Sequence, residues 1–346
     1  MLEPVEVKPK TYPTNLLPQT YWDKRVCYVR GEMNKFLDKV HDVEVYDDDV
    51  WIVTLPKCGT TWMQELLWLV MNDYDFETAK NIDLEKRSPF MEFDYIFHRD
   101  LERSLKPVEN LKRPRLVKSH LALPLLPAQI WKKKPKVVYV VRSPKDAYVS
   151  EYHFFRHMGV LPPQCSLENY INGRMYDKDC NEQFDNMYDF YKLRSEPWLF
   201  YTSFEQMKLN LRQVILDVCK FLGKSIDNDN LERMLKHLSF EEMKKNPRTN
   251  HLWEIEQVRK LTKKEDGDFN FCRKGETNSY KKELSPEMVQ QLDAFVQEKI
   301  SNYNITLDDL LLLNENREKV VSKKVSQLTR FWEEKVHEHA KLQYRK

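Results

Sequence analysis

Residues 51–62 read Trp51-Ile-Val-Thr-Leu-Pro-Lys57-Cys-Gly-Thr-Thr-Trp62. The apolar, β-branched start is typical of a buried strand, and the Pro-Lys-Cys-Gly segment is typical of a turn. Apolar residues then recur at helical spacing from Met63 to Val70. A helix that begins directly after such a loop presents unpaired backbone N–H groups and the positive end of its dipole. The stretch therefore predicts a strand, an anion-binding loop that carries a lysine, and a helix.

The composition limits the classes of protein that this chain can be. Its 346 residues can bury a large core, in one α/β domain or in two smaller ones. The net charge of +2 gives no support for a nucleic-acid or anionic-membrane partner, so anion binding must be local. No apolar run is long enough to span a bilayer, and the N-terminus lacks the pattern of a secretory signal. Six cysteines without paired spacing favour free thiols, and we expect a cytoplasmic protein.

Three more apolar segments predict strands, and basic residues follow two of them. The segments are 113–120, 136–141 and 197–203. The first ends in Lys118-Ser-His120, and Arg142 follows the second. Because predicted strands alternate with predicted helices, we expect an α/β fold, a single domain with a central parallel sheet flanked by helices. Ligands of such sheets bind beyond the carboxyl ends of the strands, so the lysine loop, His120 and Arg142 should lie close together.

The other segments complete the expected organisation. Residues 1–25 predict an extended proline-rich arm, and residues 75–110 an irregular stretch. Helices are expected over 26–40, 167–195, 204–222 and 228–244, and after the N-cap residues Ser143 and Ser285. Residues 247–284 lack periodicity and are long for a connection, which favours a functional loop or disorder. The expected parts are an N-terminal arm and helix (1–45), a main domain (46–313) and an amphipathic C-terminal helix (314–346) that docks on the domain or binds a partner.

The lysine loop differs from the phosphate-binding loop of ATP and GTP hydrolases, because its only glycine follows the lysine. Instead it resembles the 5′-phosphosulfate loop of the cytosolic sulfotransferases, Tyr-Pro-Lys-Ser-Gly-Thr-Thr-Trp. Four further blocks resemble that family's motifs in the family's order. They are Lys118-Ser-His-Leu121, Arg142-Ser-Pro-Lys-Asp with Ser150, Ser239-Phe-Glu-Glu-Met-Lys-Lys-Asn-Pro247 and Phe271-Cys-Arg-Lys-Gly275. The resemblance extends from about residue 45 to about residue 310.

The resemblance implies an enzyme that moves a sulfuryl group from 3′-phosphoadenosine-5′-phosphosulfate (PAPS) to a hydroxyl or amine. The product nucleotide would be 3′-phosphoadenosine-5′-phosphate (PAP), and no metal would be needed. His120 would be the general base, Lys57 would offset charge on the leaving oxygen, and Lys118 would steady the transferring group. The acceptor would be a small lipophilic molecule such as a phenol, a steroid or another alcohol, held by Phe90, Phe93 and Phe154 together with Lys118 and His120.

The resemblance also implies which residues hold the nucleotide. Arg142 suits the 3′-phosphate because a guanidinium can grip two oxygens at once. The full implied set is Lys57, Cys58, Gly59, Thr60, Thr61, Trp62, Arg142, Ser150, Phe204, Ser239, Phe240, Phe271, Cys272, Arg273, Lys274 and Gly275.

The chain departs from the family pattern at several positions. Cys58 replaces a serine, and we hypothesise that a thiol there, beside a lysine at a helix N-terminus, has a lowered pKa and is open to oxidation. Phe204 stands where the family commonly has a tyrosine. The family's dimer motif is poorly matched, with Ser285, Pro286 and Gln290 at three of its four defining places, so a homodimer is possible but not expected.

Three other functions remain open at this point. A related branch of enzymes eliminates the sulfated alcohol, which gives net dehydration as in retinol dehydratase. A nucleotide-binding protein without turnover would share the same loops. A small-molecule kinase would share the strand, loop and helix, but it would depend on magnesium and turn over ATP.

Overall fold

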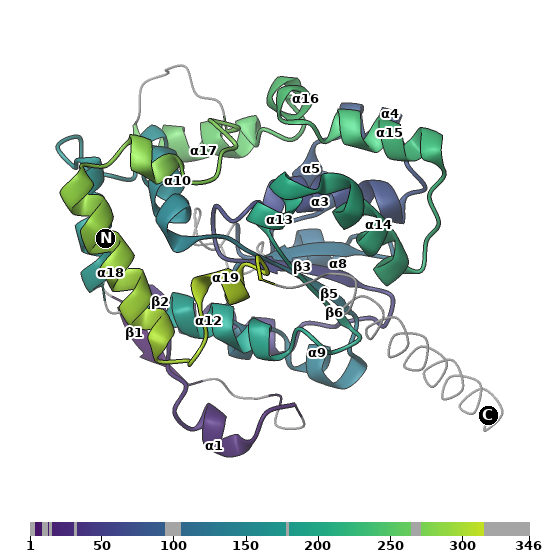
Figure 1. Cartoon of the computed structure of the whole chain (residues 1–346). Helices are drawn as coiled ribbons and strands as arrows, with labels where there is room; N and C mark the ends of the chain where they lie inside the picture. Colours follow the sequence, from purple (N-terminus) through teal and green to yellow (C-terminus); the bar gives the residue numbers. More distant parts are fainter. Residues whose placement is uncertain are drawn as a thin grey trace.

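A computed structural model describes residues 4–8, 13, 16–30, 33–93, 105–177, 180–263 and 271–314 (Figure 1). Its centre is a parallel sheet of four strands in the order β4-β3-β5-β6. The strands are β3 (Val50–Thr54), β4 (Leu116–Ser119), β5 (Lys136–Val141) and β6 (Leu199–Ser203). These are the four strands predicted from the sequence. The α/β fold with a central parallel sheet flanked by helices is therefore confirmed.

The sheet is buried on both faces, which explains why its strands read as continuous apolar runs. All five residues of β3 are buried. They alternate between two core clusters, because successive side chains of a strand point to opposite faces. Trp51 and Val53 join the cluster that contains Tyr139 and Phe190, whereas Ile52 joins the other. Figure 1 shows α3, α13 and α14 on one side of the sheet and α12, α19 and α9 on the other.

Helices occupy most of the remaining described chain. They are α1 (Gln19–Trp22), α2 (Met33–His41), α3 (Thr60–Met71), α4 (Phe76–Asn81), α5 (Leu84–Arg87), α8 (Lys106–Glu109), α9 (Ala128–Lys133), α10 (Pro144–His157), α11 (Leu167–Tyr176), α12 (Cys180–Lys192), α13 (Phe204–Leu209), α14 (Leu211–Leu222), α15 (Asn228–His237), α16 (Phe240–Lys245), α17 (Leu252–Thr262), α18 (Pro286–Ser301) and α19 (Leu307–Leu310), with short 3₁₀ turns η1 (Leu123–Leu125) and η2 (Ser279–Lys282). Among the described residues, no helix is long and apolar enough to cross a membrane.

Several sequence predictions need correction. The arm expected over 1–25 is extended only in part: it contains strand β1 (Pro4–Val7), but also helix α1. Residues 27–30 form strand β2 (Cys27–Arg30), which pairs with β1, so only α2 of the expected 26–40 helix is helical. Polar N-caps divide the two long helices expected at 204–222 and 228–244. Asn210 caps α14, and Ser239 caps α16. The amphipathic helix expected at 314–346 stays a prediction, because residues 315–346 lie outside the described residues.

Two more corrections concern segments next to the site. Residues 75–110 contain the helices α4, α5 and α8, and the aperiodic stretch 247–284 contains α17. Helix α10 starts after Ser143 as predicted, but this serine makes no side-chain cap. Its hydroxyl has no hydrogen-bond partner within the described residues, while its N–H donates to Glu205.

Both ends of the described chain are tied to the core. Arg25, from the N-terminal arm, forms ion pairs with Asp189 (2.9 Å) and Asp185 (3.1 Å) on α12. At the other end, Tyr201 of β6 donates to the carbonyl of Leu310 at 2.8 Å. The segments before and after the sheet therefore belong to the same packed unit.

Candidate active site

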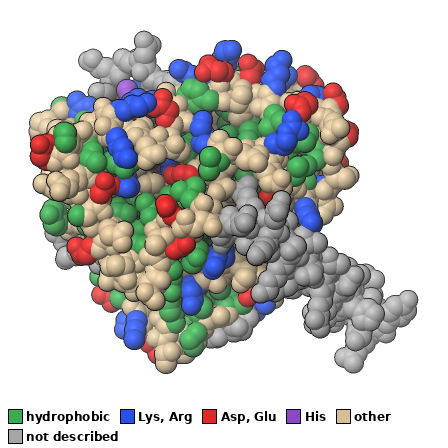
Figure 2. All heavy atoms as spheres, viewed as in Figure 1, with side chains coloured by type: hydrophobic (Ala, Val, Ile, Leu, Met, Phe, Trp, Pro, Cys, Tyr) green, Lys and Arg blue, Asp and Glu red, His purple; other side chains and the backbone are tan. Residues whose placement is uncertain are grey.

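A cavity of about 520 Å³ opens at the carboxyl edge of the sheet. The lysine loop after β3, the end of β4 and the first residue after β5 all contribute to its walls. Every sequence-predicted site residue except Cys58 lines it. Six lysine and arginine side chains line the cavity against three glutamates, so it favours an anion. By contrast, the outer face in Figure 2 mixes basic and acidic side chains, in keeping with the small net charge.

The lysine loop has a backbone that only particular residues can adopt. Gly59 caps α3 with φ 94°, in the left-handed region where glycine is favoured. A side chain at this position would also collide, because its Cβ would lie 2.9 Å from a ring carbon of Phe204. The hydroxyls of Thr60 and Thr54 lie 2.6 Å apart and join the helix start to β3. The loop thus presents its helix N-terminus to the cavity, as the sequence predicts.

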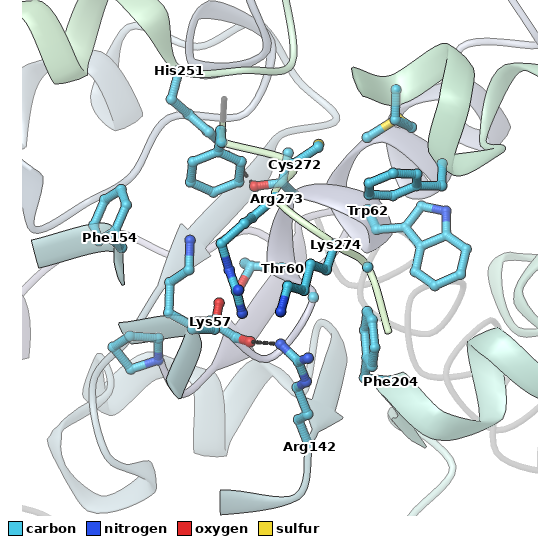
Figure 3. A pocket seen from close by; sticks show the side chains of 18 of the residues that line it. Lys57, Thr60, Trp62, Arg142, Phe154, Phe204, His251, Cys272, Arg273 and Lys274 are labelled. Atoms are coloured by element: carbon cyan, nitrogen blue, oxygen red, sulfur yellow. Dashed lines mark hydrogen bonds between the residues drawn. The ribbon is translucent and has the colours of Figure 1, made fainter. Parts of the chain in front are cut away.

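Lys57 lies between aromatic rings. Its Nζ is 4.2 Å from the ring centre of Phe154 and 3.9 Å from that of Phe271 (Figure 3). Burial, with the nearby charges of Arg142 and Lys118, lowers the pKa of Lys57 to about 7. An anion placed beside this amine would restore its charged form.

Arg142 forms the second cationic position. Its Nη1 donates to the carbonyl of Lys57 and its Nη2 to that of Glu276, both at 3.0 Å. The guanidinium also lies 4.2 Å above the ring of Phe204. These contacts leave Nε buried without a hydrogen-bond partner among the described residues, and burial lowers the pKa of the group. The guanidinium is therefore fixed in place, and its Nε–H has not yet donated a hydrogen bond to any described residue.

The loop at 271–275 brings two more cations. Arg273 and Lys274 both bind Glu283 Oε1 at 2.7 Å, and His153 contacts the other oxygen at 2.6 Å. Burial opposes ionisation of Glu283, but these three partners lower its pKa to about 2. A Cβ on Gly275, which has φ 60°, would lie only 2.5 Å from a ring carbon of Phe240. The glycine allows the loop to pack closely over Phe240.

His120 is held in one tautomer by the backbone. Its Nδ1 lies 2.8 Å from the carbonyl oxygen of Thr54, which can only accept, so Nδ1 carries the hydrogen. In the neutral ring, Nε2 then has a free lone pair. Burial and the charge of Lys118 lower the pKa of His120 to about 3, so the ring is neutral at physiological pH. The ring packs against Phe90 with 4.8 Å between centres.

The residue between Lys118 and His120 has a structural role. Ser119 donates to Glu92, and the backbone N–H of His120 also points to this carboxylate at 3.4 Å. Burial raises the pKa of Glu92 to about 7, although both hydrogen bonds favour its charged form. Glu92 thus holds the end of β4, and no motif in the sequence marked it.

The aromatic side of the cavity contains the three phenylalanines predicted from the sequence and several residues that were missed. Phe90 and Phe93 lie 6.5 Å apart between ring centres, and Phe154 projects from α10. The missed apolar residues are Phe155 and Met158 at the end of α10, and Ile255 and Val258 on α17. The hydroxyl of Thr262 on α17 donates to the carbonyl of Met158 at 2.7 Å, which joins the two helices. Helical spacing of Ile255 and Val258 is the only sequence signal for this wall.

The hypothesis of a reactive Cys58 is wrong. The residue is only 2% exposed and does not line the cavity. Burial raises the pKa of its thiol to about 12, which outweighs the effect of the Arg142 charge. Its Sγ lies 3.6 Å from the carbonyl oxygen of Pro56. Cys58 therefore packs beneath the loop.

Among the described residues, no group of three or more His, Cys, Asp or Glu side chains is arranged to hold a metal ion. Two more polar residues that the sequence reasoning missed, Glu85 and His251, also line the cavity.

The comparisons with known proteins agree with this geometry. Residues 47–304 match the family model of the sulfotransferase domain. The luciferin sulfotransferase of Photinus pyralis is 31% identical over 83% of this chain and 81% of its own length. Sulfotransferase 1 family member D1 of Mus musculus is 32% identical over 76% of this chain and 85% of its own length.

Solved structures share the fold. A retinol dehydratase in complex with retinol and PAP is 24% identical, with a TM-score of 0.68 over 81% of this chain and 89% of the other. A mouse sulfotransferase complexed with PAP is 19% identical, with a TM-score of 0.59 over 80% of this chain and 93% of the other. The family match covers well over half of the residues. The chain therefore belongs to the sulfotransferase domain family.

Proposed function

We propose that the protein transfers a sulfuryl group from PAPS to a hydroxyl or amine of a small lipophilic acceptor. The observation that carries this proposal is the meeting of three groups at one strand edge. Lys57 and Arg142 provide two linked cationic positions, and His120 provides an unprotonated nitrogen beside them. The luciferin and amine sulfotransferases among its relatives act on small acceptors, as their names state.

The residues present fit a nucleotide with anions at both ends. The unused Nε of Arg142 and the desolvated amine of Lys57 each gain from an anionic partner. Glycine at positions 59 and 275 lets the two loops pack closely against Phe204 and Phe240, which line the cavity. Trp62 and Phe204 pack edge to face and both line the cavity, so they offer aromatic surface to a purine. PAPS, when bound, would supply a sulfuryl group on a good leaving group.

The chain's own residues then have distinct tasks. His120 Nε2 accepts the proton of the acceptor hydroxyl, while Nδ1 stays fixed on Thr54. Lys57 stabilises negative charge on the departing oxygen. Lys118, held by Glu85 at 3.2 Å, stabilises the group in transfer. The aromatic side of the cavity excludes water and selects a flat apolar acceptor.

Two finer properties belong to the same proposal. The five cysteines whose side chains are described are all free, which supports a cytoplasmic location. The poorly matched dimer motif at residues 285–290 supports a protein that does not form the family's usual homodimer.

The test is transfer from labelled PAPS to phenols, steroids and aliphatic alcohols in the presence of EDTA. We expect a sulfate ester that mass spectrometry identifies. A dehydrated product from an alcohol would instead assign the chain to the eliminating branch, and magnesium-dependent turnover of ATP would assign it to the kinases.

The matched variants are His120→Ala and His120→Asn. The asparagine can keep the contact with the Thr54 carbonyl but has no counterpart of Nε2. We expect both variants to bind PAP with nearly normal affinity and to transfer at least ~100-fold more slowly, the lower range for losing a general base. A rate equal to that of the unmodified protein in either variant would disprove the mechanism.

A further inference from the structure

Four side chains from separate parts of the fold form one polar chain beside the transfer residues. His251 lies at the N-cap of α17, with Nε2 2.8 Å from the Thr61 hydroxyl and Nδ1 3.1 Å from Glu85 Oε1. Lys118 Nζ lies 3.2 Å from the same Glu85 oxygen. The order is Thr61, His251, Glu85 and Lys118, and all four residues line the cavity. The chain thus links the lysine loop to the end of β4.

The central pair is enclosed. The side chain of His251 is 8% exposed and that of Glu85 is 15% exposed. Burial opposes ionisation of Glu85, but Lys118 and His251 lower its pKa to about 2, so it is a carboxylate at neutral pH. Its second oxygen accepts the backbone N–H of Phe90 at 3.0 Å. Glu85 is therefore fixed from three sides, and it fixes Lys118 and His251 in return.

The hydrogen bonds define how the imidazole lies. A carboxylate can only accept, so His251 Nδ1 donates to Glu85 and Nε2 faces the Thr61 hydroxyl. The ring also packs against Phe271, with 4.7 Å between centres. The backbone of His251 has φ 50°, which is uncommon outside glycine. Such a conformation persists when the surrounding contacts fix the residue in place. Contacts on three sides thus specify the position of this side chain.

We propose that His251 is a positioning residue that joins the two halves of the transfer site. Through Nε2 it holds the side chain of Thr61 in the first turn of α3, beside the nucleotide site. Through Glu85 it orients the Lys118 ammonium toward the transferring group. This inference rests on the proposed function, because both contacts matter only when PAPS lies in the cavity. Neither Glu85 nor His251 falls in the five sequence blocks that resemble the family's motifs.

Two amide variants separate the two contacts. His251→Asn places an amide near the position of Nδ1, so it keeps a donor for Glu85 and loses the partner of Thr61. His251→Gln reaches the position of Nε2, so it keeps the partner of Thr61 and loses the bond to Glu85. Both variants lose the ring that packs on Phe271, and they are therefore matched controls for each other. Asparagine tolerates the positive φ of this position better than glutamine, so the stability of both variants is compared as well.

The expected result is a split between binding and turnover. His251→Asn should weaken PAP binding about 5-fold and leave kcat near normal, the usual effect of one neutral hydrogen bond. His251→Gln should leave PAP affinity near normal and lower kcat about 10-fold, because a charge-assisted contact is lost. Calorimetric titration with PAP and initial rates with labelled PAPS give the two quantities. Thermal melting of each variant verifies that the protein is folded.

The outcomes distinguish this inference from the proposed function. If both variants change PAP affinity and kcat by the same factors, or change neither, the positioning role is wrong. Glu85→Gln should reproduce the kcat loss of His251→Gln, and an unchanged kcat in that variant would also overturn it. An unmodified protein that binds no PAP would overturn the proposed function instead. If the protein binds PAP but transfers to no acceptor tested, the PAP affinities of the two His251 variants still test the proposed role of the contact between His251 and Thr61.

Discussion

The two sides of the cavity are built in different ways. On the cationic side, Arg142 donates to the carbonyls of Lys57 and Glu276, so hydrogen bonds to the backbone fix its guanidinium. On the aromatic side, apolar side chains from α17, α10 and the segment after α5, Phe93 and Ile255 among them, line the cavity. Recognition of an anion needs donors at fixed positions, whereas an apolar acceptor needs mainly a matching volume. The two sides meet where Lys57 lies over the ring of Phe154, but changes at Arg142 or at Phe93 should leave the opposite side working.

Among the variants that test the separation of the two sides, Arg142→Ala should have the largest effect. It removes a buried guanidinium from the cationic side, so PAP affinity should fall about 10- to 100-fold, the range for hydrogen bonds to a charged group. The acceptor KM at saturating PAPS should stay within about 2-fold of normal, because Arg142 is not needed on the aromatic side. Calorimetry and steady-state rates measure the two values.

Arg142→Lys is the control, since it keeps the charge but cannot bridge two carbonyls. It should lie between the alanine variant and the unmodified protein. A large rise in acceptor KM for either variant would show that the two sides are not independent.

The pH dependence of PAP binding should come from the cationic side. The pKa of Lys57 is lowered to about 7, so the amine loses its charge as pH rises above 7 in the empty cavity. Bound phosphate favours the charged form, so PAP affinity should fall with rising pH between 7 and 9, by up to about 10-fold per pH unit. The phosphates of PAP themselves are already ionised in this window.

Calorimetric titrations at several pH values test this dependence. In Lys57→Arg the charge persists across the window, so the affinity should be nearly constant. An equally steep fall in Lys57→Arg would assign the dependence to another group.

A smaller effect is expected on the aromatic side. Phe93→Ala should raise the acceptor KM about 5-fold, because a half-buried ring contributes part of the ~1.5–3 kcal/mol of a fully buried one. PAP affinity should not change. Phe93→Leu keeps most of the volume and should recover most of the loss. If Phe93→Ala weakened the binding of PAP as well as that of the acceptor, the separation of the two sides would be contradicted.

The smallest effect is expected from Cys58→Ser. Cys58 lies under the lysine loop with a raised thiol pKa, so transfer should stay within about 2-fold of normal. Iodoacetamide at neutral pH should label Cys58 no faster than buried Cys219. Rapid labelling that PAP prevents would restore the hypothesis of a reactive thiol.

The cationic side could be predicted from the sequence and the aromatic side only in part. Strand ends converge in a parallel sheet whatever their loops contain, so Lys57, His120 and Arg142 could be placed together. Helix α17 was not predicted, because few of its residues are buried: of its side chains that the structure describes, only Ile255 and Val258 are. Glu85 and His251 were missed because their meeting depends on tertiary packing of distant segments.

The reactivity of Cys58 was wrongly predicted for a related reason. Its neighbours in sequence, a lysine and a helix start, favour a thiolate, but its neighbours in space bury it. Likewise, the N-caps at Asn210 and Ser239 were visible in the sequence, yet apolar spacing on either side suggested continuous helices.

The ion pairs of Arg25 determine where the chain can be shortened. The family model begins at residue 47 and ends at residue 304. A fragment with those ends would lose Arg25, the counter-charge of Asp189, together with the buried core side chains of Trp22 and Phe36. It would also lose the Leu310 and Leu311 carbonyls, which accept from Tyr201 and Ser203 of β6. The minimal folding fragment therefore runs from before Arg25 to beyond Leu311, and the boundaries of the conserved domain model would yield an unstable protein.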